Sequence, residues 1–445
     1  MLWAILKREI LEYLISPKFL IGISIAAILM VTSTFINLAN YRQRQQDYID
    51  AQRDLKEGRV ATTIIRSPRT LSVLVQGIDR KLGTKMEVSS YRIPARLSGY
   101  MGEYTSEHLR FLSGFEAVDF AFIVRVILSL MVIFLAYNAV SEEKSQGTLR
   151  LVLSNSVPRD QLLLGKFLGG VFVVIGSMLI SALLSLLVVL LSRSIVLSRE
   201  DWMRMIAILL LSVLYVICFY SLSLLVSVLV NRPSIALMIL LQLWILLVVI
   251  YPNLGVIIAS SFYRLPSQEE VAQRKEAAFQ PHAAEYRRIS EDLHRAYSSG
   301  KMPDKILSLR NAELTALQAE SEYKVDQDFN RLLTGQVTLA RRIALLSPAV
   351  LFDMATTRIA RTDLNDYERF MRGVFGLWQA HVENEKLLYT DLTAFRKSKL
   401  PPFEYSPESR TESFSAALPQ AIVLLFIGVI LFMLAHVSFL KKDVR

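Results

Sequence analysis

The sequence SEEKSQGTLRLVLSNSVPRDQLLLGK, residues 141–166, is a polar turn between two long apolar runs, residues 117–139 and 167–192. A helix needs about 20 mostly apolar residues to cross the hydrocarbon core of a bilayer, and both runs are long enough to do so. We therefore expect the chain to enter the turn from one membrane-spanning helix and to leave it in another. The turn itself (residues 140–166) is expected at the membrane surface.

Four further runs bring the predicted membrane spans to six. These runs are residues 17–38, 204–230, 234–260 and 416–439. Hydrophobic residues make up 53% of the 445 residues and the mean hydropathy is +0.38, which is too apolar for an ordinary soluble enzyme of this length. The first run is too long for the core of a signal peptide, and no small-residue cleavage site follows it, so we expect it to be retained. The predicted fold is a mainly α, polytopic membrane protein.

Lysine and arginine near the span ends predict the orientation, because cytoplasmic loops carry an excess of them. One side of the membrane holds the larger set: Lys7, Arg8, Lys18, Lys144, Arg150, Arg159, Lys166, Arg232, Lys441, Lys442 and Arg445. The other side's one short loop carries Arg193, Arg199 and Arg204, and its two long segments count little under this rule. We therefore place both termini and the turn in the cytoplasm.

Residues 1–16 precede the first span and have helical apolar spacing. Trp3, Leu6, Ile10, Tyr13 and Leu14 are predicted on one face, opposite Lys7, Arg8, Glu9 and Glu12. Ser16-Pro17 then marks a boundary. This pattern indicates an amphipathic interfacial helix joined to the first span by an elbow; the alternative is a plain cytoplasmic extension of that span.

Two large insertions are predicted outside the cytoplasm. Residues 39–116 begin as a charged helix and continue with three short β-branched stretches, 61–65, 71–75 and 86–93, which predict a mixed α/β unit. Residues 261–415 are mainly helical, with breaks expected at Pro281 and at residues 299–303.

The sequence offers no catalytic or metal-binding pattern. Near Gly165-Lys166, Asp160 stands where a phosphate-binding loop needs its first glycine, and Phe167 stands where it needs Ser or Thr. The five histidines are scattered, Gly-x-Ser-x-Gly is absent, and the one cysteine, Cys218, forms no intrachain disulfide. The net charge of +10 flanks spans without interleaved aromatics, so we expect membrane lipids rather than nucleic acid as its partner.

The turn contains Glu-x-x-x-Gly-Thr-Leu, Leu-Ser, Val-Pro-Arg and Leu-Gly-Lys in order. This series resembles the first cytoplasmic loop of type-2 ATP-binding-cassette (ABC) exporter permeases, in which a coupling helix seats in a groove of the nucleotide-binding subunit. The Lys7-Arg8-Glu9 helix is similar to that family's elbow helix. Tyr251-Pro252-Asn253, taken as a break in the fifth span, and residues 346–349 resemble its short outer-face helices. The long insertions depart from compact members and resemble a bacterial subgroup with extended outer domains.

The resemblance implies an ATPase-docking surface formed or shaped by residues of the turn. They are Glu142, Glu143, Gly147, Thr148, Leu149, Arg150, Ser154, Val157, Pro158 and Arg159. Alternatively, Glu142 and Glu143 merely end a span, and Arg150 and Arg159 are positive-inside anchors.

Two polar residues inside spans are candidates for function, because such residues are costly in lipid. Arg125 is expected to snorkel outward or to pair with Asp119 or Glu116, and Gln242 is a candidate for lining a path. The third span carries small residues at four-residue intervals, which favour close helix packing within the chain over a dimer seam. These residues are Gly165, Gly169, Ser177, Ser181 and Ser185.

The resemblance predicts the membrane permease of an ABC exporter in a bacterial inner membrane. It implies a separate ATPase that binds ATP and magnesium, and a second permease copy or paralogue. An alternative is a mechanotransmitting subunit that relays ATPase strokes to a periplasmic partner without transport. A sensor or anchor without an ATPase is a third reading.

Overall fold

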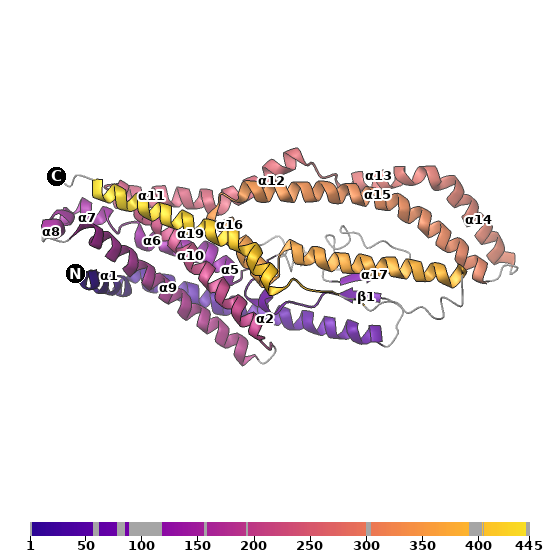
Figure 1. Cartoon of the computed structure of the whole chain (residues 1–445), viewed down its shortest axis with the longest axis horizontal. Coiled ribbons are helices and arrows are strands. Elements are labelled where there is room, and N and C mark those ends of the chain that lie inside the picture. The colour runs from indigo at the N-terminus through magenta and orange to yellow at the C-terminus, as the bar shows by residue number, and fades with distance from the viewer. Residues whose placement is uncertain are drawn as a thin grey trace.

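The computed structural model describes residues 2–56, 62–77, 85–88, 118–154, 158–192, 195–299, 304–390, 403 and 405–441. The molecule is elongated (Figure 1): a helical bundle with both termini forms one end, and an arm of long helices forms the other. The described part is mainly helical, which confirms the predicted fold class.

Within the described residues, six helical segments are long and apolar enough to cross a membrane: Pro17–Arg53, Phe120–Ser145, Arg159–Leu191, Arg199–Leu229, Pro233–Phe262 and Arg410–Lys441. The first lies in α2 (Pro17–Lys56), whose 40 residues extend about 60 Å, twice the hydrocarbon thickness, so that its C-terminal part stands outside the bilayer. The second comprises α5 (Phe120–Phe122), a π-helical segment η2 (Ile123–Leu128), α6 (Ser129–Ala136) and α7 (Ser141–Ser145).

Helix α10 (Arg199–Leu229) lies at the centre of the bundle. It packs against α19 (Arg410–Lys441), α9 (Arg159–Leu191) and α6. Two of its buried serines bond back to its own backbone: Ser212 donates to the Ile208 carbonyl at 2.8 Å and Ser223 to the Phe219 carbonyl at 2.8 Å. Small side chains of this kind let membrane helices approach closely, since packing rather than hydrophobicity drives association in lipid.

The fifth span is continuous, so the predicted break at residues 251–253 is wrong. It runs through α11 (Pro233–Trp244), the π-helical segment η3 (Ile245–Ile250) and α12 (Tyr251–Phe262). Pro252 lacks the N–H that a regular helical turn uses, and the wider π turns just before it accommodate that loss. The span is therefore helical without interruption from Pro233 to Phe262.

The outer arm is a helical hairpin followed by a return helix. Its elements are α13 (Gln268–Phe279), the 3-10 turn η4 (Gln280–His282), α14 (Ala283–Ser299), α15 (Asp304–Ala344) and α17 (Leu364–Thr390). The 41 residues of α15 extend about 60 Å. Helix α15 packs on α12, where Gly335 lies under the ring of Tyr263 and Gly255 lies against the Ala340 carbonyl.

The mixed unit after the first span contains fewer strands than predicted, within its described residues. β1 (Thr62–Ile65) pairs antiparallel with β2 (Lys85–Val88), with Thr62 opposite Val88. The expected strand at 71–75 is instead a 3-10 helix, η1 (Thr70–Val73), and Leu71, Val73 and Val75 are buried. Its β-branched residues therefore serve packing, not strand pairing.

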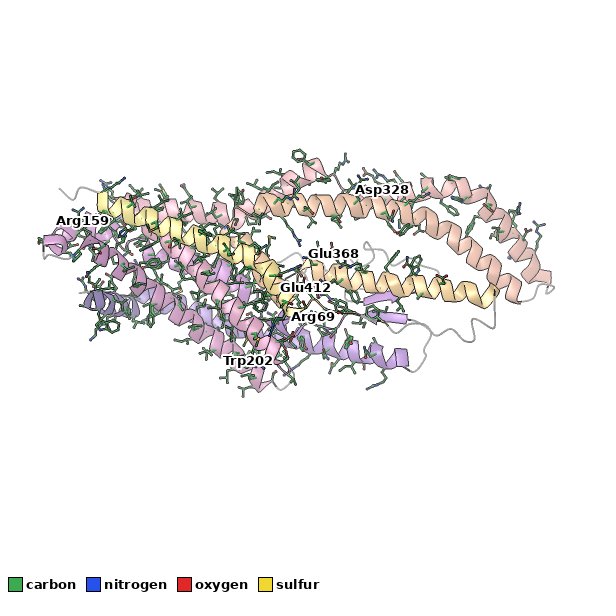
Figure 2. The ribbon with its side chains drawn as sticks, viewed as in Figure 1. Arg69, Arg159, Trp202, Asp328, Glu368 and Glu412 are labelled. Carbon is green, nitrogen blue, oxygen red and sulfur yellow. The ribbon has the colours of Figure 1, made fainter. Side chains whose placement is uncertain are left out.

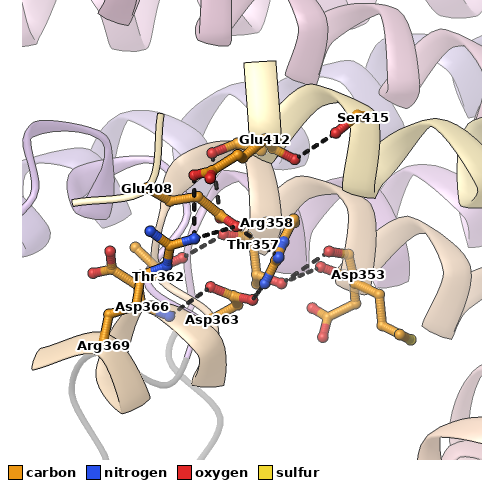
Figure 3. Close-up of polar contacts among 12 residues, drawn as sticks. Asp353, Thr357, Arg358, Thr362, Asp363, Asp366, Arg369, Glu408, Glu412 and Ser415 are labelled. Atoms are coloured by element: carbon orange, nitrogen blue, oxygen red, sulfur yellow. Dashed lines mark hydrogen bonds and ion pairs between the residues drawn. The ribbon is translucent and has the colours of Figure 1, made fainter. Parts of the chain in front are cut away.

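An ion-pair network joins the arm to the bundle where α16 (Pro348–Ala360) ends, α17 begins and α19 approaches (Figure 3). Arg358 binds Asp363 and Glu408, both at 2.7 Å, and Arg369 binds Glu412 at 3.1 Å. Because these residues come from three separate segments, the network fixes the arm to the outer end of the sixth span.

Candidate functional site

The polar turn forms two short helices at the end of the bundle that holds both termini (Figure 1). Helix α7 ends at Ser145, and Gly147 adopts φ 73°, a left-handed conformation that L side chains rarely adopt. Helix α8 (Thr148–Ser154) follows, and its first residue bonds back through its hydroxyl to the Glu143 carbonyl at 3.3 Å. Gly147 therefore supplies the bend that the sequence pattern predicted. We call residues 140–154 the docking turn.

The docking turn is attached to the C-terminal end of α10. The backbone N–H groups of Val140 and Ser141 both donate to the Ser227 hydroxyl at 3.0 Å. The Lys144 ammonium donates to the carbonyls of Ser227 at 3.4 Å, of Val230 at 3.5 Å and of Val228. These carbonyls lie at the negative end of the helix dipole, where a cation is stabilised.

A second attachment joins the start of α9 to the sixth span. Arg159 donates to the carbonyl of Leu440, at the C-terminal end of α19, at 3.1 Å. Figure 2 shows Arg159 at the docking-turn end of the bundle and Trp202 near the opposite end of the membrane helices. Lys144 and Arg159, two of the basic residues that predict the orientation, thus also donate to carbonyls at the C-terminal ends of α10 and α19.

A third attachment is a buried ion triad that joins the docking turn to the N-terminal helix α1 (Leu2–Ile15). The Lys166 ammonium lies 2.8 Å from Glu9 of α1 and 2.8 Å from Glu143 of α7. The side chains of Lys166 and Glu9 are only 5% and 8% exposed. Burial raises the pKa of Glu9 above its usual value, and Lys166 opposes that rise.

The position of Glu9 corrects the prediction that it lies on the solvated face of the N-terminal helix. Glu9 faces α9 instead, because Gly165 and Gly169 leave room there for α1. A Cβ at Gly169 would lie 2.9 Å from Glu9 Cβ, and one at Gly165 would lie 2.6 Å from Ile5 Cγ2. The small residues of the third span therefore pack within the chain, as predicted.

Only part of the predicted docking set faces outward. Leu149 is 3% exposed and packs with Leu162 and Leu163, so it holds α8 in place, and Glu143 points inward to Lys166. Ser154, Pro158 and Gly147 are exposed, while Glu142 and Thr148 are half-buried. The side chain of Arg150 and all of Val157 lie outside the described residues.

Sequence reasoning left Leu151 out of the docking set, although it is the large apolar side chain that α8 exposes most, at 67%, among those described. The spacing of the leucines in the sequence already indicated that one of them would be exposed. Residues two apart lie about 200° apart around a helix, so Leu149 and Leu151 cannot both be buried on one face. Single exposed leucines are common on protein surfaces, so Leu151 is a docking candidate because it lies in the turn whose motif resembles the coupling loop.

A family model described as ABC-2 family transporter protein matches residues 3–444. The chain belongs to this family. No curated protein matches it. The match to the family model confirms the family resemblance. ABC-2 permeases are membrane subunits of transporters and generally partner with an ABC ATPase.

In this ABC-2 permease, Arg125 lies in η2 and pairs with Asp353 of α16 at 3.4 Å. This partner, 228 residues away along the chain, differs from those predicted. Asp119 instead caps α5 and accepts the backbone N–H groups of Gln76 and Phe122, both at 2.7 Å. Glu116 lies outside the described residues.

The two π-helical segments meet beside Arg125. The Trp244 indole, just before η3, donates to the Ser129 hydroxyl at 2.8 Å, just after η2. The Tyr215 hydroxyl donates to the Arg125 carbonyl at 2.8 Å. π-helical turns often occur at functional sites, and Gln242 is exposed two residues before Trp244.

Proposed function

We propose that this chain is the membrane permease of an ABC exporter of a bacterial inner membrane, driven by a separate ATPase that docks on residues 140–154. Both termini then lie in the cytoplasm and the arm lies outside. The observation that carries the proposal is the docking turn itself. It exposes Leu151 at its tip, and its base is tied to the end of α10 and, through Glu143 and Lys166, to α1. The start of α9, which follows it, is tied to the end of α19.

The attachments would allow a movement of the docking turn to be transmitted to the membrane helices. ATP and magnesium would bind to the ATPase, and closure of the ATPase dimer would displace the docking turn. Since Ser227, Arg159 and Lys166 fasten this region to three other helices, the displacement would move these helices together. A rigid-body movement of this kind, driven from a separate site, would re-pack the spans between inward and outward arrangements.

A second permease copy or paralogue would complete the transporter. The support for it is the fifth span, which is the least buried of the six: only 17% of its most apolar window is buried, against 61% for the second span. Gln242 lies on this span and is exposed in the single chain. A pair of such spans would bring the two glutamines to the subunit seam, where a path for a substrate would run.

The arm favours a second candidate function, mechanotransmission to a periplasmic partner without transport. Helix α12 continues the fifth span without interruption and packs on α15, to which the Tyr251 hydroxyl also donates at the Ile343 carbonyl (3.1 Å). The Arg358 network fixes α17 to the sixth span. Motion of the spans would thus reach the end of the arm.

Docking is tested by replacing the exposed leucine. Leu151→Asp should weaken co-purification of the partner ABC ATPase about 30-fold or more, as loss of an interface hot spot does. Leu346→Asp is the matched control, because Leu346 is at least as exposed, at 75%, but lies before α16 on the side that the proposed orientation places outside. Full binding by Leu151→Asp would refute docking at this turn, and loss of binding by Leu346→Asp would refute the orientation.

A further inference from the structure

Helix α1 has two apolar faces, whereas its sequence predicted one. The inner face packs on α9 through Ile5 and Leu6, beside Glu9. The outer face exposes apolar side chains to the surroundings of the bundle. These are Trp3 (76%), Leu11 (47%), Leu14 (45%) and Ile15 (75%).

The outer face of α1 continues into the lipid-facing surface of the first span. Helix α2 begins at Pro17, directly after the elbow, and its residues Leu20 and Ile21 are also exposed. A soluble helix does not expose such a run of large apolar side chains without an apolar environment. Since α2 contains a candidate membrane span, we expect lipid to reach the adjoining outer face of α1 as well.

A shallow, open groove of about 610 Å³ lies on this face and is lined by residues 4–16 alone. Ala4, Leu11, Ile15 and Ser16 form its walls, Lys7 and Arg8 supply positive charge, and Glu12 supplies one negative charge. Arg8 also binds Glu12 at 2.8 Å, which leaves Lys7 as the main positive charge of the groove.

The ion triad increases the positive character of this surface. Glu9 is the neighbour of Arg8 in sequence, but it is turned away from the groove and held by Lys166. Lys18, at the start of α2, is a further cation near the elbow, but its ammonium donates to the Tyr137 hydroxyl at 2.9 Å and lies outside the groove. The groove therefore combines an apolar wall with a net positive rim at the boundary of the bilayer.

We propose that this groove on α1 binds an anionic phospholipid of the leaflet on the docking-turn side. Lys7 and Arg8 bind the phosphate-containing headgroup, and the acyl chains lie along Leu11, Ile15 and the adjoining surface of α2. A basic residue near an anionic membrane surface contributes to binding in this way. The site does not require any soluble partner, so it stands or falls separately from ATPase docking.

Occupancy of the groove has a direct route to the docking turn. Glu9 lies one residue from Arg8 and shares Lys166 with Glu143 of α7. A lipid that holds α1 at the membrane surface thereby also steadies Glu143. The composition of the leaflet would in this way regulate how firmly the turn is held.

Trp3 provides the assay, because bromine atoms on lipids quench tryptophan on contact. The full chain is reconstituted in nanodiscs with brominated phosphatidylglycerol or with brominated phosphatidylcholine, and the Trp3→Phe variant supplies the background of the other three tryptophans. We expect stronger quenching of Trp3 by the anionic lipid. Lys7→Gln should lower that preference about fivefold, as expected for one surface charge, and Lys7→Arg should preserve it.

Arg232→Gln is the matched control, since Arg232 is exposed at the same end of the bundle but lies between α10 and α11. It should leave Trp3 quenching unchanged. Equal quenching by the two lipids, or an unchanged preference in Lys7→Gln, would overturn the proposal. Absence of quenching by either lipid would show that protein covers the groove. Loss of the preference on adding glycerophosphate would show that a soluble phosphate suffices; either result would also overturn it.

Discussion

Replacement of Lys166 by methionine should loosen the docking turn from the rest of the bundle. The change keeps the length of the side chain but leaves Glu9 and Glu143 facing each other without their shared cation. Removing one partner of a buried ion pair typically costs about 3–5 kcal/mol. Glu143 is 21% exposed and water can reach it, so we expect a cost at or just below the lower limit of that range, about 2–3 kcal/mol.

Hydrogen exchange of the full chain, read by mass spectrometry, measures the loss of local stability in each helix separately. A decrease of about 2–3 kcal/mol in the free energy of local opening accelerates exchange about 30- to 160-fold in α1 and α7. Peptides from the centre of α10 should be unaffected. The double variant Lys166→Met/Glu9→Gln should exchange more slowly than Lys166→Met alone, because it removes the uncompensated acid.

Glu9→Gln and Glu12→Gln form a matched pair on α1. Glu9 is buried against Lys166, whereas Glu12 binds Arg8 at the surface, with both side chains more than half exposed. Glu12→Gln should leave exchange unchanged, since exposed ion pairs contribute little. Unchanged exchange of α7 in Lys166→Met, or simple additivity in the double variant, would refute the view that the triad holds the turn.

Three further predictions concern packing, the arm and pH. Gly170→Ala should lower the apparent melting temperature, because the added Cβ would collide with the Tyr220 ring. Gly176→Ala is the control, because Gly176 has open space around it, and it should leave the melting temperature unchanged. Equal effects of the two substitutions would contradict this packing. Arg358→Met should destabilise the arm and accelerate hydrogen exchange in α17, because it leaves Asp363 and Glu408 without their cation. Arg264→Met removes only an exposed ion pair and should leave this exchange unchanged. Burial raises the pKa of Asp363 above 3.8, so its carboxyl binds a proton more tightly in the folded chain, and its contribution to stability is lost as pH rises from 3.8 through that raised pKa. The wild-type melting temperature should therefore fall more between pH 4 and pH 6 than that of Asp363→Asn, and identical pH profiles would exclude this role.

The sequence alone predicted the six spans and the motif of the docking turn. Both are contiguous features: a span is a run of apolar residues, and Gly147 marks a bend because its backbone must adopt a positive φ. Neither depends on what lies beside it in space. The family match over residues 3–444 agrees with these local signals.

The tertiary structure decided which face each helix presents and which charges meet. Helical spacing gave α1 one apolar face, but the glycines of α9 admit Glu9 to a buried pair, and Arg125 finds Asp353 from a distant segment. Leu149 and Leu151 have the same chemistry, yet one is buried and the other exposed, because α8 can turn only one of them toward Leu162. Hydropathy records the preference of each residue for lipid or water, whereas pairing depends on residues far apart in sequence that only the packed helices bring together.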